Sequence, residues 1–183
     1  MVKCNNSVFV RVCFSFTQKN LLEFLTQILC NCIIKNKGCD MRDKIIRISW
    51  SDPILVDEAI ESEKSLQPGL YYITRVLHEK EISLYIGKAT RTIRERLIDH
   101  RKEWLSNRYG EKYVRIGSIV YPHCIDSEII DHAESALIFE HGNMLIDNTA
   151  KIQTYSYSEL YQIQNIGNLG ELKKVIRMHN HPD

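Results

Sequence analysis

The sequence predicts an α/β protein of the α+β type, in which helices flank a small three-stranded antiparallel sheet and an extra helix precedes it. Residues 70–77, 82–86 and 113–121 are rich in aromatic and β-branched side chains. In the first of these segments Leu70, Tyr72, Thr74 and Val76 alternate with Tyr71, Ile73, Arg75 and Leu77, which is the period of a strand. Apolar residues at helical spacing follow the second and the third of these segments. With 183 residues, the chain is long enough for one domain with an appendage.

Residues 1–50 predict an N-terminal helical extension. Its apolar residues recur at the spacing of an amphipathic helix, namely Leu21, Phe24, Leu25, Ile28, Leu29 and Cys32. Thr17 or Asn20 can cap this helix, and Gly38 can end it. Residues 51–67, with five acidic residues against one lysine, predict an acidic linker or a short surface helix.

Residues 68–183 predict the main domain. The first two strands form an antiparallel hairpin that ends at Gly87. The next helix has an apolar stripe, and Thr90 or Thr92 can cap it. After the strand 113–121, a second helix runs from near Asp126 to Gly142, and a last helix is predicted over residues 171–178.

The cysteines cluster at the start of the chain. Five of the six lie within the first 40 residues: Cys4, Cys13, Cys30, Cys32 and Cys39. They predict reduced thiols, because this length can build a core without disulfides and no secretory signal or membrane span is evident. We therefore expect a cytoplasmic protein with no membrane partner. A zinc site in this segment stays a hypothesis, since it has no CxxC pair and no histidine before His78.

Charge is unevenly distributed although the whole chain carries only +1. Residues 69–115 carry eleven Lys and Arg against six Asp and Glu, whereas residues 116–183 carry four against nine. The net charge alone gives no sign of a nucleic-acid partner, but the basic segment coincides with the predicted hairpin and first helix. Clustered Lys and Arg supply sequence-independent affinity for phosphate.

An ordered set of motif residues resembles the GIY-YIG nuclease superfamily over roughly residues 68–150. The set comprises Gly69-Leu70-Tyr71, Tyr85-Ile86-Gly87, Arg96, His100, Glu134 and Asn148. Leu70 replaces the family's isoleucine. One extra residue between Gly87 and Arg96 leaves Arg94 as a rival catalytic arginine, but Arg96 and His100 share a helix face at i, i+4 as the family requires.

The resemblance implies a fold, a reaction and a set of residue roles. Tyr71 would be the general base, with Tyr85 beside it, and His100 could assist. Arg96 would bind the scissile phosphate, and Glu134 would hold one Mg²⁺ or Mn²⁺ ion. Gly69, Gly87 and Asn148 would support the site.

These roles are chemically reasonable for the residue types. Hard oxygen ligands suit Mg²⁺, and the arginine fork suits a phosphate. A free phenol with a pKa near 10 needs a nearby positive charge before it can accept a proton at neutral pH. Taken alone, however, paired strand tyrosines are more often packing partners, Asn148 could be a turn residue, and Glu140 is a competing ligand.

The helix that carries Glu134 has two predicted faces. Glu134 shares one side with Ile130, Leu137 and Ile138, where a carboxylate is costly unless it is paired or binds a metal. The residues expected to face solvent are Glu128, Asp131, His132 and Ser135. Around Arg96, the residues expected to contact DNA are Lys88, Arg91, Arg94, Arg101 and Lys102, although acidic neighbours would equally suit a solvated helix.

The function predicted is a metal-dependent DNA endonuclease of the restriction or mobile-element kind. A nuclease of DNA repair or recombination is the alternative within the class, and a catalytically silent nucleic-acid-binding module is the alternative outside it. Cutting both strands would need a homodimer or two successive nicks. Without a strongly basic accessory domain, we expect weak non-specific affinity for DNA.

Overall fold

The computed structural model of the chain describes residues 45–152 and 161–178, so the predicted N-terminal helix and five of the cysteines lie outside the described residues. The described part forms a seven-stranded mixed sheet in the order β4-β3-β5-β1-β6-β7, with β2 also paired to β5. The strands are β1 (Ile45–Trp50), β2 (Ile54–Leu55), β3 (Gly69–Leu77), β4 (Lys80–Ala89), β5 (Glu111–Tyr121), β6 (Gln162–Gly167) and β7 (Val175–Arg177). The helices are α2 (Val56–Glu61), α3 (Ile93–Glu103) and α4 (Ser127–His141), with the 3₁₀ turns η1 (Glu63–Leu66) and η2 (Leu105–Asn107).

The prediction of a three-stranded antiparallel sheet is wrong. The three expected strands are present as β4, β3 and β5, side by side and antiparallel, but the sheet continues past β5. The second edge of β5 pairs with β2 at its start and with β1 at its end, and β1 then pairs in parallel with β6. An unpaired β5 edge would leave its N–H and C=O groups without partners, and these extra strands supply them. The class remains α+β.

The predicted last helix is also wrong. Residues 175–177 form β7, which pairs antiparallel with β6. Ile176 and Met178 are buried whereas Val175 and Arg177 are exposed, which is the period of a strand. Gly170, with φ +56°, lies in the turn before it. Upstream, the predicted acidic linker contains β2, α2 and η1, and α2 buries Val56, Ala59 and Ile60.

The central elements agree with the sequence. Thr92 caps α3 by accepting a hydrogen bond from the Glu95 N–H at 3.2 Å. Asp126 caps α4 by accepting from the Ile129 N–H at 2.8 Å, and the helix ends at Gly142. Both predicted helices are therefore confirmed, as is Thr92 as the cap of α3 and the start of α4 near Asp126.

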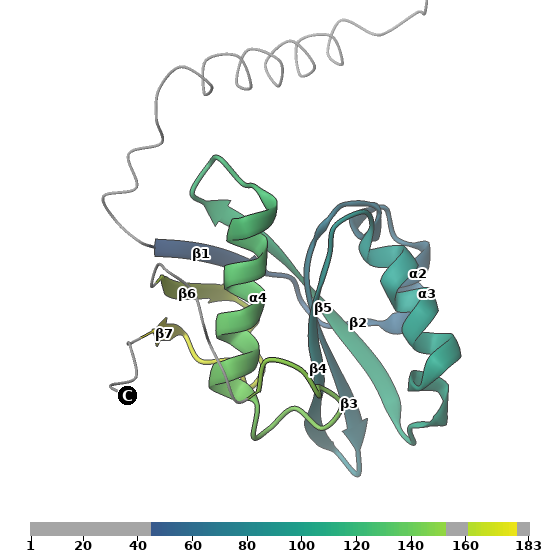
Figure 1. Cartoon of the computed structure of the whole chain (residues 1–183). Coiled ribbons are helices and arrows are strands. Elements are labelled where there is room, and N and C mark those ends of the chain that lie inside the picture. The colour runs from purple at the N-terminus through teal and green to yellow at the C-terminus, as the bar shows by residue number, and fades with distance from the viewer. Residues whose placement is uncertain (1–44, 153–160, 179–183) are drawn as a thin grey trace, which may run out of the picture. The chain divides into compact units, whose positions relative to one another are not determined.

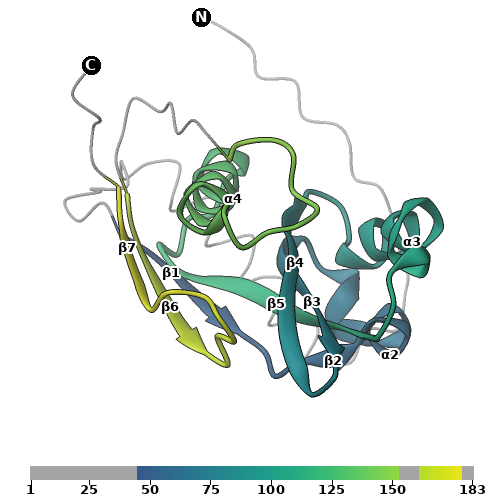
Figure 2. The same ribbon diagram turned by 90° about the horizontal axis from the view of Figure 1, so that it is seen from below.

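Helix α4 covers one face of the sheet and helices α2 and α3 cover the other (Figures 1 and 2), and each side has its own hydrophobic core. The α4-side core packs α4 into the concave face, and its members include Ile46, Ile48, Trp50, Leu70, Tyr72, Ile86, Ala133, Leu137 and Ile163. The α3-side core packs α2 and α3 on the other face, and its members include Val56, Ala59, Tyr71, Ile73, Leu84, Ile93, Leu97 and Val114. None of the helices in the described residues is long and apolar enough to cross a membrane. Strand β4 forms one edge of the sheet, and it contacts both α3 and α4.

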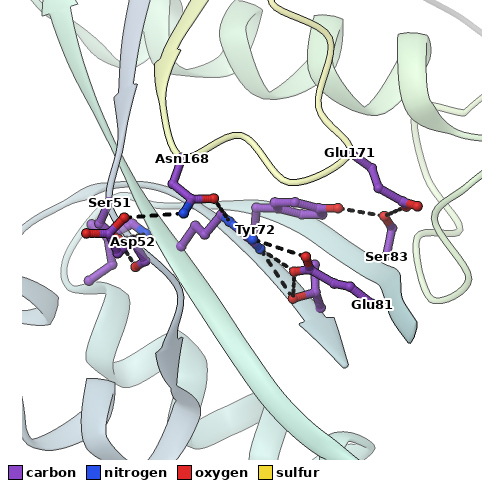
Figure 3. Close-up of polar contacts among 10 residues, drawn as sticks. Ser51, Asp52, Tyr72, Glu81, Ser83, Asn168 and Glu171 are labelled. Atoms are coloured by element: carbon purple, nitrogen blue, oxygen red, sulfur yellow. Dashed lines mark hydrogen bonds and ion pairs between the residues drawn. The ribbon is translucent and has the colours of Figure 1, made fainter. Parts of the chain in front are cut away.

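A polar network ties the β6–β7 connection to the β3–β4 hairpin (Figure 3). Arg115 of β5 is almost fully buried; it forms an ion pair with Glu81 and donates to the Asn168 amide oxygen at 3.2 Å. Ser83 bonds the Tyr72 hydroxyl at 2.6 Å and donates to Glu171 at 2.6 Å. Burial raises the pKa of Tyr72 to about 12, so its hydroxyl stays protonated.

Candidate active site

The two motif tyrosines lie side by side on the α3 face of the β3–β4 hairpin. Their rings stack with centroids 6.0 Å apart and planes inclined by 20°. A bulge in β4 helps to place them: Ile73 pairs with Tyr85 and Thr74 with Ser83, so Leu84 is the extra residue. Leu84 and Tyr85 therefore both join the α3-side core, as bulged neighbours do. Tyr71 is fully buried and Tyr85 is half-buried.

Gly87 gives these two rings their space. It lies opposite Tyr71 in the ladder, and a Cβ atom there would be 2.5 Å from the Tyr71 hydroxyl oxygen and 2.6 Å from the Tyr85 ring. At Gly69, a Cβ would lie 3.0 Å from the Gly117 carbonyl oxygen. Both motif glycines are thus places of close approach, which explains why a side chain is absent there.

His100 links the tyrosines to helix α3. Its Nε2 lies 2.9 Å from the Tyr71 hydroxyl oxygen, and its Nδ1 accepts a hydrogen bond from the Trp104 indole N–H at 3.0 Å. Burial, and after it the charge of Arg96, lowers the pKa of His100 to about 4. His100 is therefore neutral at physiological pH. Trp104 was not among the predicted site residues, although its i+4 spacing from His100 was a usable signal.

The structure brings Arg96, and not Arg94, to the tyrosines. The Arg96 side chain lies close enough to the hydroxyls of Tyr71 and Tyr85 to lower the pKa of both. Arg94 instead turns toward η1, where its guanidinium approaches the Ser62 carbonyl at 3.4 Å. Burial raises the pKa of Tyr71 and of Tyr85, and the positive charge of Arg96 opposes that rise at both hydroxyls.

Glu134 belongs to α4, which lies on the other side of the sheet from α3, and its side chain extends to the edge of β4. It is 8% exposed, and its Oε1 accepts from the Lys88 backbone N–H at 3.0 Å. Its negative charge contributes to the raised pKa of Tyr71 and Tyr85, after burial as the main cause. The expected burial of Glu134 is confirmed, but the expected exposure of His132 and Ser135 is wrong. Both are buried because the sheet curves around α4 (Figure 2).

Two lysines and a second carboxylate surround Glu134. The Lys151 ammonium lies 2.7 Å from Glu134 and 2.8 Å from Asp131, and the Lys88 ammonium bonds Asp131 as well. The predicted set did not include Asp131 or Lys151, although the i, i+3 spacing of Asp131 and Glu134 places them on one helix face. We refer to Lys88, Asp131, Glu134 and Lys151 as the carboxylate–lysine cluster.

The carboxylate–lysine cluster fits a hard divalent cation in its donor chemistry. Two carboxylates provide oxygen ligands, and the Lys151 ammonium between them shows that the place accommodates positive charge. Among the described residues, no group of three or more His, Cys, Asp and Glu side chains comes together. A cation held here would therefore keep several water ligands, as Mg²⁺ commonly does.

Asn148 closes the open edge of β4. Its amide oxygen accepts from the Ile86 N–H and its amide nitrogen donates to the Ile86 carbonyl, both at 2.9 Å. The Asp147 N–H donates to the Leu84 carbonyl at 2.9 Å, and Glu134 accepts from the next outward N–H, that of Lys88. The loop after α4 thus acts as a partner for the edge strand.

The residues expected to contact DNA differ in their surroundings. Lys88 belongs to the carboxylate–lysine cluster, Arg94 contacts η1, and Arg101 forms an ion pair with Asp57 at 3.0 Å. Arg91 and Lys102 are exposed. The rival ligand Glu140 forms an ion pair with Lys173. Two hollows lie elsewhere, one of about 300 Å³ beside α2 and η2 and one beside Trp50 and Asn168. Arg101 lines the first of them, and neither hollow contains the tyrosines, Arg96, His100 or Glu134.

Comparison with models of protein families, with curated proteins and with solved structures gave no match to this chain. The resemblance to GIY-YIG nucleases therefore depends on the motif residues alone.

Proposed function

We propose that this chain is a metal-dependent DNA endonuclease of the GIY-YIG type. The observation that supports the proposal is that four side chains, those of Tyr71, Tyr85, Arg96 and His100, come together beside β4, and that Glu134 accepts a hydrogen bond from the Lys88 N–H of the same strand. Phosphodiester hydrolysis needs a phosphate-binding cation, a group that handles a proton, and stabilisation of developing negative charge. This set of residues offers each of them.

Each residue has a role that follows from its surroundings. Arg96 is partly exposed beside the tyrosine hydroxyls, so its guanidinium can bind the phosphate of a DNA strand and offset its charge. Glu134 and Asp131 would hold a divalent cation, which when bound would supply Lewis-acid stabilisation of the phosphate oxygens. Asn148 and Gly87 fix the strand that carries Tyr85.

The tyrosines are protonated at neutral pH because burial raises the pKa of both hydroxyls. Each therefore presents a proton and an acceptor lone pair near the phosphate site. Tyr71 serves as general base only once added positive charge lowers its pKa, and the Arg96 guanidinium already acts in that direction.

The decisive experiment incubates supercoiled plasmid with the protein and Mg²⁺, Mn²⁺ or EDTA. We expect nicking with either metal and none with EDTA. Arg96→Ala and Glu134→Ala should each lower the nicking rate at least about 100-fold, as loss of one charge-stabilising group commonly does. Matched controls are Arg94→Ala and Glu140→Ala, which change the same residue types on the same two helices away from the site and should stay within about threefold of wild type.

Two results would reject the nuclease proposal. One is wild-type protein that neither nicks nor linearises DNA with any metal. The other is a Glu134→Ala variant that cuts as well as wild type. Branched and nicked DNA should be included, because preferential cutting of those substrates would favour a repair or recombination nuclease. Sedimentation velocity on the active protein would show whether cutting both strands involves a homodimer.

One observation favours the silent nucleic-acid-binding module as a second candidate. Lys151 and Lys88 already neutralise the carboxylates that would hold a cation. A module of this kind would bind DNA in a salt-sensitive way and cut nothing under any metal condition. Gel-shift titrations at two salt concentrations, run beside the plasmid assay, separate the two candidates.

A further inference from the structure

The hydrogen bond from Trp104 fixes which nitrogen of His100 carries the proton. An indole N–H can only donate, so the His100 Nδ1 that lies 3.0 Å from it must be the unprotonated, accepting nitrogen. In a neutral imidazole the other nitrogen then carries the hydrogen. His100 Nε2 is therefore the N–H, and it lies 2.9 Å from the Tyr71 hydroxyl oxygen.

The direction of the next hydrogen bonds follows from this assignment. His100 donates to the Tyr71 oxygen through its Nε2–H. The hydrogen bonds therefore run from Trp104 to His100 and from His100 to Tyr71.

We propose that Trp104 is a positioning residue that locks His100 in its Nε2–H tautomer and so makes His100 a donor to Tyr71. This inference rests on the proposed nuclease function for its catalytic consequence. In this tautomer, His100 cannot take the Tyr71 proton through Nε2. It instead donates a hydrogen bond to the Tyr71 oxygen, and such a donor stabilises negative charge that develops on that oxygen.

The placement of Trp104 is consistent with a positioning role. Trp104 follows the last residue of α3, four residues after His100, and its backbone N–H also bonds the His100 carbonyl at 3.1 Å. Its ring centroid lies 5.4 Å from that of His100 and 5.9 Å from that of Tyr85. A protonated His100 would turn both ring nitrogens into donors and oppose the Trp104 N–H. The lowered pKa of His100 agrees with this arrangement.

The test uses a matched pair of variants, Trp104→Gln and Trp104→Glu. The two new side chains have nearly the same shape, but glutamine can donate a hydrogen bond to Nδ1 whereas an ionised glutamate can only accept one. ¹⁵N NMR of labelled protein at neutral pH reports the protonation of each His100 nitrogen. We expect a protonated Nε2 and an unprotonated Nδ1 in wild type and in Trp104→Gln, and a protonated Nδ1 in Trp104→Glu.

The nicking assay supplies the second readout. Trp104→Gln should keep kcat within about threefold of wild type, and Trp104→Glu should lose about tenfold or more, a typical size for impaired proton handling. KM for DNA, measured at two salt concentrations, shows whether the added charge of glutamate merely weakens binding.

Each outcome has a clear meaning. A protonated Nδ1 in wild type overturns the tautomer assignment, and it can be read even if both variants fail to fold. Equal spectra or equal kcat for the Gln and Glu variants overturn the positioning role. If wild type shows the expected tautomer but never cuts DNA, the nuclease proposal fails while the hydrogen-bond assignment stands.

Discussion

At the scale of single residues, Gly87 of the Tyr85-Ile86-Gly87 motif is a glycine because there is no space for a side chain, and not because of its backbone conformation. A Cβ atom there would lie 2.5 Å from the Tyr71 oxygen and 2.6 Å from the Tyr85 ring. Tyr71 is fully buried, so its ring has little room to move aside. We predict that Gly87→Ala lowers the free energy of unfolding by about 1–3 kcal/mol through overpacking. Urea denaturation of both proteins measures this difference.

The control for Gly87→Ala is the same substitution in a Tyr71→Ala background. Removing the Tyr71 ring removes the closest contact and gives the Tyr85 ring room to move aside, so the cost of the added methyl group should fall. An equal cost in both backgrounds would show that Tyr71 is not the source of the strain. Such coupling between neighbours is what a double-mutant cycle measures.

The residues of the site differ in how far the sequence could reveal them. The burial of Glu134 follows from its helical spacing to Leu137 and Ile138, and the structure bears it out. The same reasoning failed for His132 and Ser135, since helical spacing defines one buried face and cannot show that a curved sheet covers more of α4. Lys151 lies in a loop with no periodic pattern, so its ion pairs could not be inferred.

At the scale of elements, the outer edge of β4 depends on Asn148. Its amide satisfies both the N–H and the C=O of Ile86, a fully buried residue. We predict that Asn148→Ala lowers the free energy of unfolding by about 2–3 kcal/mol, because two buried backbone groups lose their partner. Hydrogen exchange at the Ile86 amide should also become faster.

Asn143 provides the matched control for Asn148. It is an exposed residue of the same connection after α4, and Asn143→Ala should change stability by less than about 0.5 kcal/mol. If the two substitutions have equal effects, Asn148 does not hold the edge of β4. In that case the close fit of this loop to the strand would have to depend on the Asp147 backbone alone.

The elements that were predicted correctly have strong local signals. The nine residues of strand β3 are rich in aromatic and β-branched side chains, and α3 and α4 begin at side-chain caps. Strands β6 and β7 have weaker signals, since β7 has only three residues and the polar residues of β6 include two glutamines and an asparagine. Their strand conformation comes from pairing with each other and with β1, which no local pattern encodes. Strand β1 has a clear alternation of buried and less buried residues, but it lies in the segment predicted as the N-terminal helical extension.

At the scale of the whole described domain, β5 joins two halves of the sheet. Its first part pairs with β3 and its last part pairs with β1 (Figure 1). The predicted three-stranded unit and the additional strands are therefore joined through β5. Arg115 lies near the middle of β5 and bonds Glu81 of β4 and Asn168 of the β6–β7 connection. A single buried guanidinium therefore links strand β4 to the C-terminal connection.

Replacing Arg115 should weaken the whole domain. Arg115→Met leaves Glu81 without its ion-pair partner and Asn168 without its donor, and we predict a loss of about 2–4 kcal/mol, since Glu81 is only partly buried. Arg47→Met is the control, because Arg47 is exposed and bonds only the Gln164 side chain at the surface; it should cost less than about 0.5 kcal/mol. Urea denaturation at pH 7 compares the three proteins.

The same pair predicts how stability depends on pH. Hydrogen bonds from Arg115, and after them the bond from Thr74, hold the pKa of Glu81 below its ordinary value of 4.5. A carboxylate with a lowered pKa in the folded state stabilises that state above its ordinary pKa, and the contribution is lost as the pH falls through the lowered value. Wild-type stability should therefore drop between about pH 5 and pH 3 more steeply than that of Arg115→Met. Parallel curves for the two proteins over this range would show that Arg115 does not govern the ionisation of Glu81. The link between β4, β5 and the C-terminal connection would then have to depend on other contacts, namely those of Asn168, Tyr72, Ser83 and Glu171.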